Sequence, residues 1–285
     1  MRTTMKKGLV LEGGAHRAIY TAGVLDVFME NGISFDGVIG VSAGAIHGGS
    51  FVAGQKGRNI KYTLKYANDR RYMSFYSLIT TGDIVGKKFC YEELPNKLVP
   101  FDYKAFAKAK TEFYVTCSNV ETGKPEYIKC SDMHKQMDCL RASASLPYVS
   151  RIVEIGKKKL LDGGITDSIP VRAFQKMGYS KCVVVQTRPE GYIKGPDKLL
   201  WLGKFLYRKY PNFIKALCLR HVAYNANLAD IGEQQKQGKI FVIRPSENIK
   251  ISRMEKNSDI IKAVYELGRK DALSSLPQMK KFLDN

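Results

Sequence analysis

A serine between two glycines is the residue of this 285-residue chain best suited to nucleophilic chemistry. Ser42 stands in Gly40-Val41-Ser42-Ala43-Gly44, directly after the apolar pair Val38-Ile39. A Gly-x-Ser-x-Gly pentapeptide at a strand-to-helix turn is a nucleophile elbow, which exposes the serine hydroxyl above the end of a sheet. Gly40 and Gly44 leave room for the neighbouring strand and helix. The pattern predicts a serine acyl hydrolase.

A serine hydroxyl is a poor nucleophile until a base takes its proton, and His221 is one candidate for that base. Ser42, Asp162 and His221 follow the chain order of the Ser-Asp-His triad of α/β-hydrolases, which would suit small esters. His221, however, lies in a basic, aromatic, helical stretch without a loop signal, where a lone histidine is more often structural. The other histidines are His16, His47 and His134.

Asp162 is the second candidate for the base. It stands in Leu160-Leu161-Asp162-Gly163-Gly164, where an apolar strand breaks into a glycine turn. A carboxylate there can reach across the end of a sheet, and Gly163 and Gly164 allow substrate to approach closely. An ordinary Asx turn explains the same Asp-Gly pair. Taken alone, the motif favours the Asx turn.

A glycine-rich loop near the start of the chain supplies a third chemical element. Gly13-Gly14-Ala15-His16-Arg17 follows the apolar run Gly8-Leu9-Val10-Leu11 and begins a helix. Its N–H groups would carry the positive end of a helix dipole into a cleft, which suits a tetrahedral oxyanion or a phosphate. The loop lacks the Gly-x-Gly-x-x-Gly fingerprint, and no Gly-Lys-Ser/Thr follows.

Taken together, these motifs resemble the patatin-like phospholipase family. The resemblance rests on residues 13–18, 40–44 and 162–164, and on Arg141-Ala142-Ser143-Ala144-Ser145-Leu146-Pro147, in family order over about residues 8–190. It is closest to bacterial patatin-like proteins with an added C-terminal region. It implies a three-layer α/β/α sandwich with a mainly parallel sheet. The implied organisation is a catalytic domain over residues 1–190 and a helical or mixed extension over 191–285 packed on it.

The resemblance also implies a mechanism. Asp162 would act as general base toward Ser42, which forms an acyl-enzyme with a fatty-acyl ester, and no metal or organic cofactor takes part. The N–H groups of Gly13, Gly14 and Ala15 would hold the oxyanion, and Arg17 would fix the loop or a lipid phosphate. The family has glycines where this chain has Ala15 and Ala18. If φ is positive there, an alanine costs roughly 1 kcal/mol or more, so a slow or non-catalytic lipid-binding member is an alternative.

The order of elements agrees with this fold. Short apolar runs alternate with helical patterns at the start of the chain, which predicts an α/β domain with a mainly parallel sheet. A polar, aromatic stretch over residues 58–110 is typical of helices inserted beside the sheet, and residues 253–274 are expected to form a terminal helical region. The predicted strands are 8–11, 38–41, 113–117, 126–130, 151–155, 159–161, 181–186 and 239–243.

Charge and composition indicate the partners. The net charge is +19, and residues 198–229 contain six basic residues interleaved with aromatics and no Asp or Glu. Such a surface attracts an anionic membrane, although packing in the core is the favoured explanation for most of these aromatics. Nucleic acid is not expected, because no nucleic-acid-binding motif accompanies the charge. Six cysteines without paired spacing, and no leader or spanning segment, predict a cytoplasmic protein with at most peripheral contact with the inner membrane face.

Overall fold

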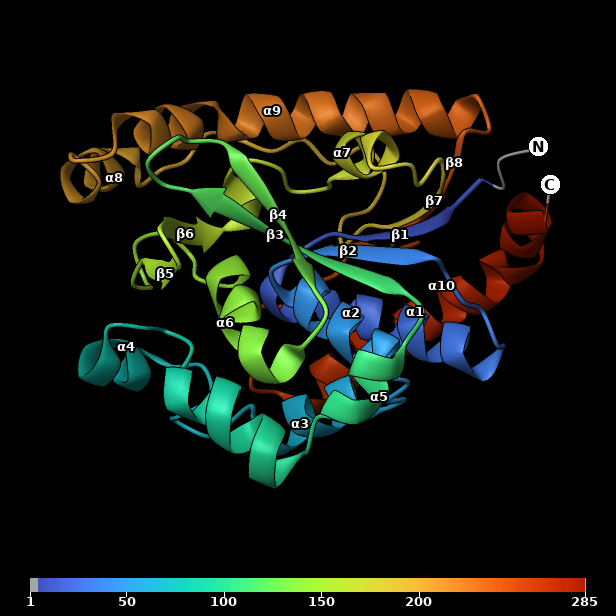
Figure 1. The fold of residues 1–285 in the computed structure, drawn as a ribbon, viewed down its shortest axis with the longest axis horizontal. Coiled ribbons are helices and arrows are strands. Elements are labelled where there is room, and N and C mark those ends of the chain that lie inside the picture. Colours follow the sequence, from blue (N-terminus) through green and yellow to red (C-terminus); the bar gives the residue numbers. More distant parts are fainter. Residues whose placement is uncertain (1–4, 285) are drawn as a thin grey trace.

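A mixed β-sheet runs through the middle of the molecule (Figure 1). The computed structural model describes residues 5–284, within which eight strands form this sheet in the order β5-β6-β3-β2-β1-β7-β8, with β4 paired to β3 outside that path. Every strand predicted from the sequence is present. The strands are β1 (Lys7–Leu11), β2 (Gly37–Val41), β3 (Glu112–Asn119), β4 (Pro125–Cys130), β5 (Val153–Ile155), β6 (Lys158–Asp162), β7 (Lys181–Val185) and β8 (Ile240–Ile243).

The central part of the sheet is parallel. β1 pairs in parallel with β2 and β7, while β2–β3 and β7–β8 are also parallel. β4 and β6 both run antiparallel to β3, and β5 runs antiparallel to β6. Because parallel strands end at the same edge, the loops after β1, β2 and β7 meet there. This edge is where the glycine loop and the Ser42 turn lie.

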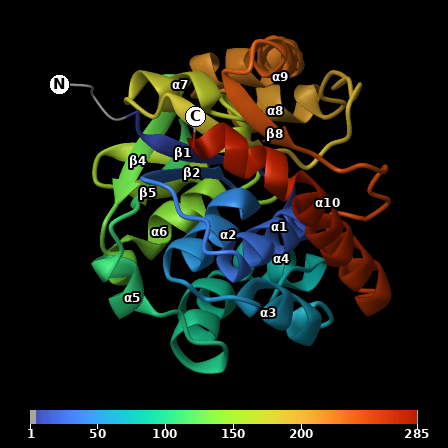
Figure 2. The same cartoon turned by 90° about the vertical axis from the view of Figure 1, so that its right-hand side faces the viewer.

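Helices cover both faces of the sheet, which confirms the three-layer α/β/α architecture. In Figures 1 and 2, α7 and α9 lie on one side of β1 and β2, and α1, α2 and α10 lie on the other. A hydrophobic core fills the space on each side. The helices are η1 (Ala15–Ala18), α1 (Ile19–Glu30), α2 (Ala43–Val52), α3 (Arg58–Tyr66), α4 (Phe75–Thr81), η2 (Phe89–Leu98), α5 (Tyr103–Lys108), α6 (Met133–Ser143), η3 (Gly163–Ile165), α7 (Val171–Lys176), α8 (Leu200–Leu206), α9 (Pro211–Lys236) and α10 (Ser258–Asp284).

The C-terminal helix α10 packs closely on α1. A Cβ on Gly23 would lie 2.2 Å from the Tyr265 carbonyl oxygen, and one on Gly268 would lie 2.0 Å from that of Tyr20, so only glycine permits this approach. The Tyr20 hydroxyl donates to Asp271 at 3.0 Å across the same contact. α10 extends beyond the expected residues 253–274 because its last turns also find buried contacts.

The aromatic residues of the 198–229 segment divide into two groups. Tyr207, Phe213 and Tyr224 are buried, as the packing interpretation predicts. Trp201 and Phe205, on α8, are exposed. Over residues 5–284, the structure contains no helix with both the length and the apolar character that crossing a membrane requires.

Candidate active site

Ser42 forms a strained turn between β2 and α2. Its φ is 54° and its ψ is −127°, a combination that residues with a side chain rarely adopt. A Cβ on Gly40 would lie 2.5 Å from Ala45 Cα, and one on Gly44 would lie 2.6 Å from the carbonyl oxygen of Glu12. Both glycines of the pentapeptide are therefore required by close backbone contacts. The turn has the geometry of a nucleophile elbow.

The end of α6 holds the backbone of both predicted catalytic residues. The Ser42 N–H donates to Ser143 Oγ at 2.7 Å, and Ser143 Oγ donates in turn to the Thr116 carbonyl at 2.7 Å. Two residues later, the Ser145 carbonyl accepts the Asp162 N–H at 2.8 Å. The Ala/Ser-rich segment therefore fixes the distance between the Ser42 turn and the end of β6.

Asp162 is buried at the end of β6 beside Ser42. Its Oδ1 accepts the Gly164 N–H at 2.7 Å, whereas its Oδ2 is buried and receives no aligned hydrogen bond within residues 5–284. Burial raises the pKa of Asp162, and the nearby Ser42 hydroxyl, the Gly164 N–H, Arg220 and Arg253 offset part of that rise. The carboxylate is thus a stronger base than an exposed aspartate.

The glycine loop passes directly against Ser42. A Cβ on Gly13 would lie 2.9 Å from Ser42 Cβ, and the Thr187 hydroxyl holds the Gly13 carbonyl at 2.9 Å. The N–H groups of Gly13, Gly14 and Ala15 have no acceptor in the described part of the chain. The Arg17 N–H instead donates to the Gly14 carbonyl at 3.1 Å. Three backbone donors therefore remain open beside Ser42, and Arg17 is available only through its side chain.

The two alanines that replace family glycines differ in their backbone conformation. Ala15 has φ 50°, in the left-handed region, whereas Ala18 has φ −70° and is ordinary helical backbone. The strain foreseen for this loop therefore falls on Ala15 alone.

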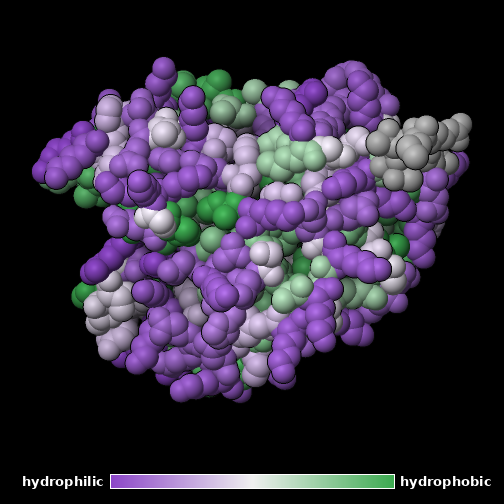
Figure 3. All heavy atoms as spheres, in the orientation of Figure 1, coloured by the Kyte–Doolittle hydropathy of each residue, from purple (hydrophilic) through white to green (hydrophobic). Residues whose placement is uncertain are grey.

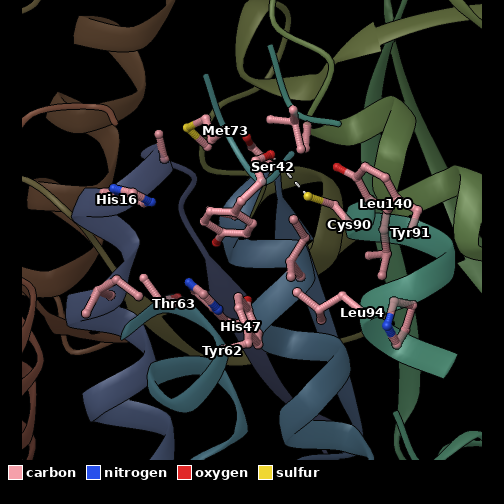
Figure 4. A pocket seen from close by; sticks show the side chains of 18 of the residues that line it. His16, Ser42, His47, Tyr62, Thr63, Met73, Cys90, Tyr91, Leu94 and Leu140 are labelled. Atoms are coloured by element: carbon pink, nitrogen blue, oxygen red, sulfur yellow. Dashed lines mark hydrogen bonds between the residues drawn. The ribbon is translucent and has the colours of Figure 1, made fainter. Parts of the chain in front are cut away.

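An apolar cavity of about 970 Å³, counted with its open mouth, begins at Ser42 (Figure 4). Ile19, Leu94, Leu140 and Leu146 are among the side chains that line it. Arg58 also borders it, but its guanidinium N–H groups donate to the Pro100 and Val99 carbonyls and to Ser50, so these donors are already occupied. The cavity can hold a hydrocarbon chain.

Two of the histidines border this apolar cavity and are neutral. Burial lowers the pKa of His47 to about 4 and also lowers the pKa of His16. His221, on α9, lines neither cavity at Ser42. No histidine in the described residues hydrogen-bonds to Ser42 or Asp162. The geometry gives the predicted Ser-Asp-His triad no support.

A second, polar cavity of about 730 Å³ opens on the other side of Ser42. Ser42, Ala15 and Leu146 line both cavities, so the serine stands where they meet. Asp162 and the glycine loop border the polar cavity. Its cationic residues are Arg17, Arg188, Lys194, Arg220 and Arg253. Of these five, the sequence motifs pointed to Arg17 alone. The stretch 198–229, which contains no Asp or Glu, was a signal for Arg220, but no sequence pattern indicated which basic residues would meet in one cavity.

Comparisons with known proteins show the family of the chain. A family model described as patatin-like phospholipase matches residues 9–174, and one described as a domain of unknown function matches residues 210–284. The chain is 27% identical over 270 residues to the uncharacterized protein YjjU of Escherichia coli K12, covering 92% of this chain and 74% of that protein.

More distant matches extend the comparison. The chain is 27% identical over 202 residues to lysophospholipase nte1 of Aspergillus terreus, across 65% of this chain but only 12% of that much longer protein. The crystal structure of VipD from Legionella pneumophila aligns over 98% of this chain and 67% of VipD, with a TM-score of 0.48 and 13% identity.

Replacing Ser143 tests how the Ser42 turn is held. In Ser143→Ala the buried Ser42 N–H loses its acceptor, so we expect the free energy of unfolding to fall by about 1–3 kcal/mol, measured by urea denaturation. Ser145→Ala is the matched control, because its hydroxyl only bonds back to the Arg141 carbonyl at 2.8 Å. Equal losses in the two variants would contradict a special role for Ser143.

Replacing Ala15 tests the strain in the glycine loop. Glycine adopts φ 50° without steric cost, but it loses more conformational entropy on folding. We expect Ala15→Gly to leave the free energy of unfolding unchanged or to raise it by up to about 1 kcal/mol, measured by chemical denaturation. Ala18→Gly should lower the free energy of unfolding, because Ala18 has ordinary helical backbone. A clear loss of stability in Ala15→Gly would mean that the left-handed conformation is not strained.

Proposed function

The chain belongs to the patatin-like phospholipase family and is a hydrolase; on this premise we propose that it cleaves fatty-acyl esters of phospholipids through a Ser42–Asp162 dyad. One observation carries the proposal: Ser42 stands where an apolar cavity meets a polar cavity bordered by Asp162. An acyl chain fits the first, and the polar part of a lipid fits the second. The ester bond would then lie at the serine.

The first half of the reaction acylates the enzyme. Asp162 Oδ2 takes the proton of the Ser42 hydroxyl as Ser42 Oγ forms a bond to the ester carbonyl carbon. The carbonyl π electrons move to its oxygen, and the N–H groups of Gly13, Gly14 and Ala15 stabilise that oxyanion. As the intermediate collapses, the C–O bond to the alcohol breaks, and Asp162 returns the proton to the departing oxygen.

The second half releases the fatty acid. Asp162 takes a proton from water, whose oxygen attacks the acyl carbon and regenerates the oxyanion. The bond to Ser42 Oγ then breaks, and the proton passes from Asp162 to the serine. The raised pKa of Asp162 suits it to both transfers, because a base works best when its pKa is closer to the working pH.

We propose that exposed apolar residues of α4 and α8 form a surface for the lipid interface. We define it as the interfacial surface: the exposed apolar residues Phe75, Tyr76 and Ile79 of α4 and Trp201, Phe205 and Leu206 of α8. Met73 and Val85, at the base of the α4 loop, line the cavity and pair with each other. α4 and α8 project on the same side in Figure 1, with a recess between the projecting ends in Figure 3.

The loop around Tyr148 connects both parts of the interfacial surface to the site. The Ile84 N–H donates to the Val149 carbonyl at 2.8 Å, and Tyr148 bonds to Tyr207 and Asp197 next to α8. The exposed basic residues Lys198, Lys204 and Arg208 accompany the apolar ones. Apolar and basic side chains together favour an anionic membrane surface, which we propose the protein meets from the cytoplasmic side.

The dyad predicts how three substitutions affect activity. Ser42→Ala should reduce hydrolysis of p-nitrophenyl esters to background, and Asp162→Asn should reduce it by about 10²–10⁴-fold, whereas His221→Ala should keep most of it. A fluorophosphonate probe should label Ser42 in the unaltered protein. An inactive His221→Ala with an active Asp162→Asn would support the triad, and an unlabelled Ser42 would support a non-catalytic lipid-binding protein.

Asp162→Asn should also stabilise the protein. Folding raises the pKa of this carboxyl group above its value in the unfolded chain. The group therefore stabilises the fold at a pH below its unfolded-state pKa, and this stabilisation is lost as the pH rises through its folded-state pKa. At neutral pH the buried Asp162 charge therefore opposes folding. We expect the melting temperature of Asp162→Asn to exceed that of the unaltered protein at pH 7 and the difference to vanish near pH 3. A lower melting temperature at pH 7 would contradict this account.

The interfacial surface predicts vesicle binding. Trp201 and Ile79 are 69% and 83% exposed, so Trp201→Glu and Ile79→Glu should leave the fold intact. Each should weaken co-sedimentation with vesicles that contain anionic lipid by about tenfold, since a negative charge replaces an apolar side chain that the membrane would bury. Leu273→Glu on α10 is the matched control, because Leu273 is exposed but outside this surface. Unchanged binding of both variants would exclude this surface.

A further inference from the structure

The polar cavity carries a large excess of positive charge. Arg17, Arg188, Lys194, Arg220 and Arg253 border it, and the carboxylates among its lining residues are Glu12 and Asp162. None of the five cations forms an ion pair with a carboxylate within residues 5–284, where 15 ion pairs occur elsewhere. A cluster of unpaired cations, four of them partly buried or buried, is unfavourable unless an anion joins it.

Glu12 offsets only part of this positive charge and forms an ion pair with none of the five cations, because neutral donors occupy both of its oxygens. The Tyr224 hydroxyl donates to Oε1 at 2.6 Å, and the Thr187 N–H donates to Oε2 at 2.6 Å. Glu12 therefore anchors α9 and the end of β7 to the glycine loop. Asp162, the other carboxylate, lies beside Ser42 and accepts the Gly164 N–H, and it too forms no ion pair with the five cations.

Neutral groups also hold the cations in place. The Lys194 backbone exchanges two hydrogen bonds with the Asn225 side chain, at 2.8 and 3.0 Å, and its ammonium lies 4.7 Å from the centre of the Tyr224 ring. Arg188 lies over the Tyr192 ring at 4.2 Å. Arg220 Nε donates to the Gly164 carbonyl at 2.7 Å. These contacts position the charges without cancelling them.

The cations lower one another's pKa values. The pKa of Lys194 falls to about 8, mainly through burial and then through the repulsion of Arg220, Arg17 and Arg188, against the opposing effect of Glu12. Burial and the neighbouring Arg188 and Arg253 lower the pKa of Arg17 as well. The Arg17 Nε is buried without a hydrogen-bond partner in the described residues. An anion in the cavity would relieve both groups.

We propose that this cavity binds the phosphate of the substrate headgroup and selects glycerolipids whose phosphate is a monoester over those that carry phosphocholine, a diester. The inference rests on the proposed hydrolysis at Ser42, where the two cavities meet. A phosphate monoester carries up to two negative charges and three acceptor oxygens, which match clustered arginines. A choline ammonium would be repelled by the same cations. Lys194, Arg220 and Arg253 lie within residues 191–285, so this C-terminal region would provide most of the headgroup selectivity.

A binding experiment tests the cavity independently of catalysis. Calorimetry on Ser42→Ala compares glycerol 3-phosphate, glycerophosphocholine and inorganic phosphate. We expect glycerol 3-phosphate to bind at least tenfold more tightly than glycerophosphocholine, and Lys194→Met or Arg253→Gln in the Ser42→Ala background to lose about tenfold in that affinity. Lys215→Met, an exposed change on α9 outside the cavity, is the charge-matched control. Arg253 is exposed, so its replacement should not disturb folding.

A hydrolysis experiment on the active protein identifies the source of the phosphate. The ratio of kcat/KM for a 1-acyl-glycerol 3-phosphate to that for the matching 1-acyl-glycerophosphocholine should be tenfold or more, and Lys194→Met should lower this ratio while Lys215→Met does not. A ratio near one, with p-nitrophenyl esters still cleaved, would overturn the headgroup inference and leave the hydrolase intact.

Two further outcomes separate the inference from the hydrolase proposal. Binding of glycerol 3-phosphate that depends on Lys194, without cleavage of any ester, would refute the hydrolase and with it the lipid selectivity, leaving only a phosphate site. Inorganic phosphate that binds as tightly as glycerol 3-phosphate, with no headgroup preference in hydrolysis, would assign the cavity to free phosphate and overturn the inference.

Discussion

The positive φ of Ser42 is the constraint on which the site depends. This conformation turns the chain sharply from β2 into α2 and lifts the hydroxyl above the sheet edge, but its backbone is strained. The hydrogen bond from its N–H to Ser143 ties the turn to α6 and, through Ser143, to β3. Gly13 and Gly44 allow the neighbouring loop to pass close to it. The serine is thus held by three separate parts of the chain.

The same region concentrates other features that oppose folding. Ala15 has a positive φ, Asp162 is a buried carboxyl with one unpartnered oxygen, and the cations of the polar cavity are unpaired. The surrounding strands offset these costs, because β2 is buried along its whole length and β1 and β7 along nearly all of theirs. Backbone strain and unpaired charges thus gather at the site, while the strands beneath it pack regularly. This arrangement is typical of a functional site in a well-packed fold.

The sequence predicts the parts of this protein that local patterns encode. Apolar runs identified every strand, and glycine spacing identified the Ser42 turn, the loop after β1 and the turn after Asp162. The converging cations could not be predicted, because they come from separate loops and helices that only the fold brings together. Arg220 and His221 illustrate the difficulty. They are neighbours in the sequence, but successive residues of a helix point about 100° apart. Only Arg220 lines the polar cavity. The glycine contact between α1 and α10 is equally long-range.

The two halves of the site are electrostatically connected. Arg220 and Arg253 border the polar cavity, and their positive charges also counteract the rise in the pKa of Asp162. An anionic phosphate bound to them would screen this effect, so the pKa of Asp162 would rise further when substrate is in place. Asp162 would then be a stronger base with a phosphorylated lipid bound than in the empty site. In the proposed Ser42–Asp162 dyad, the base would in this way gain basicity from a phosphorylated substrate, without a histidine.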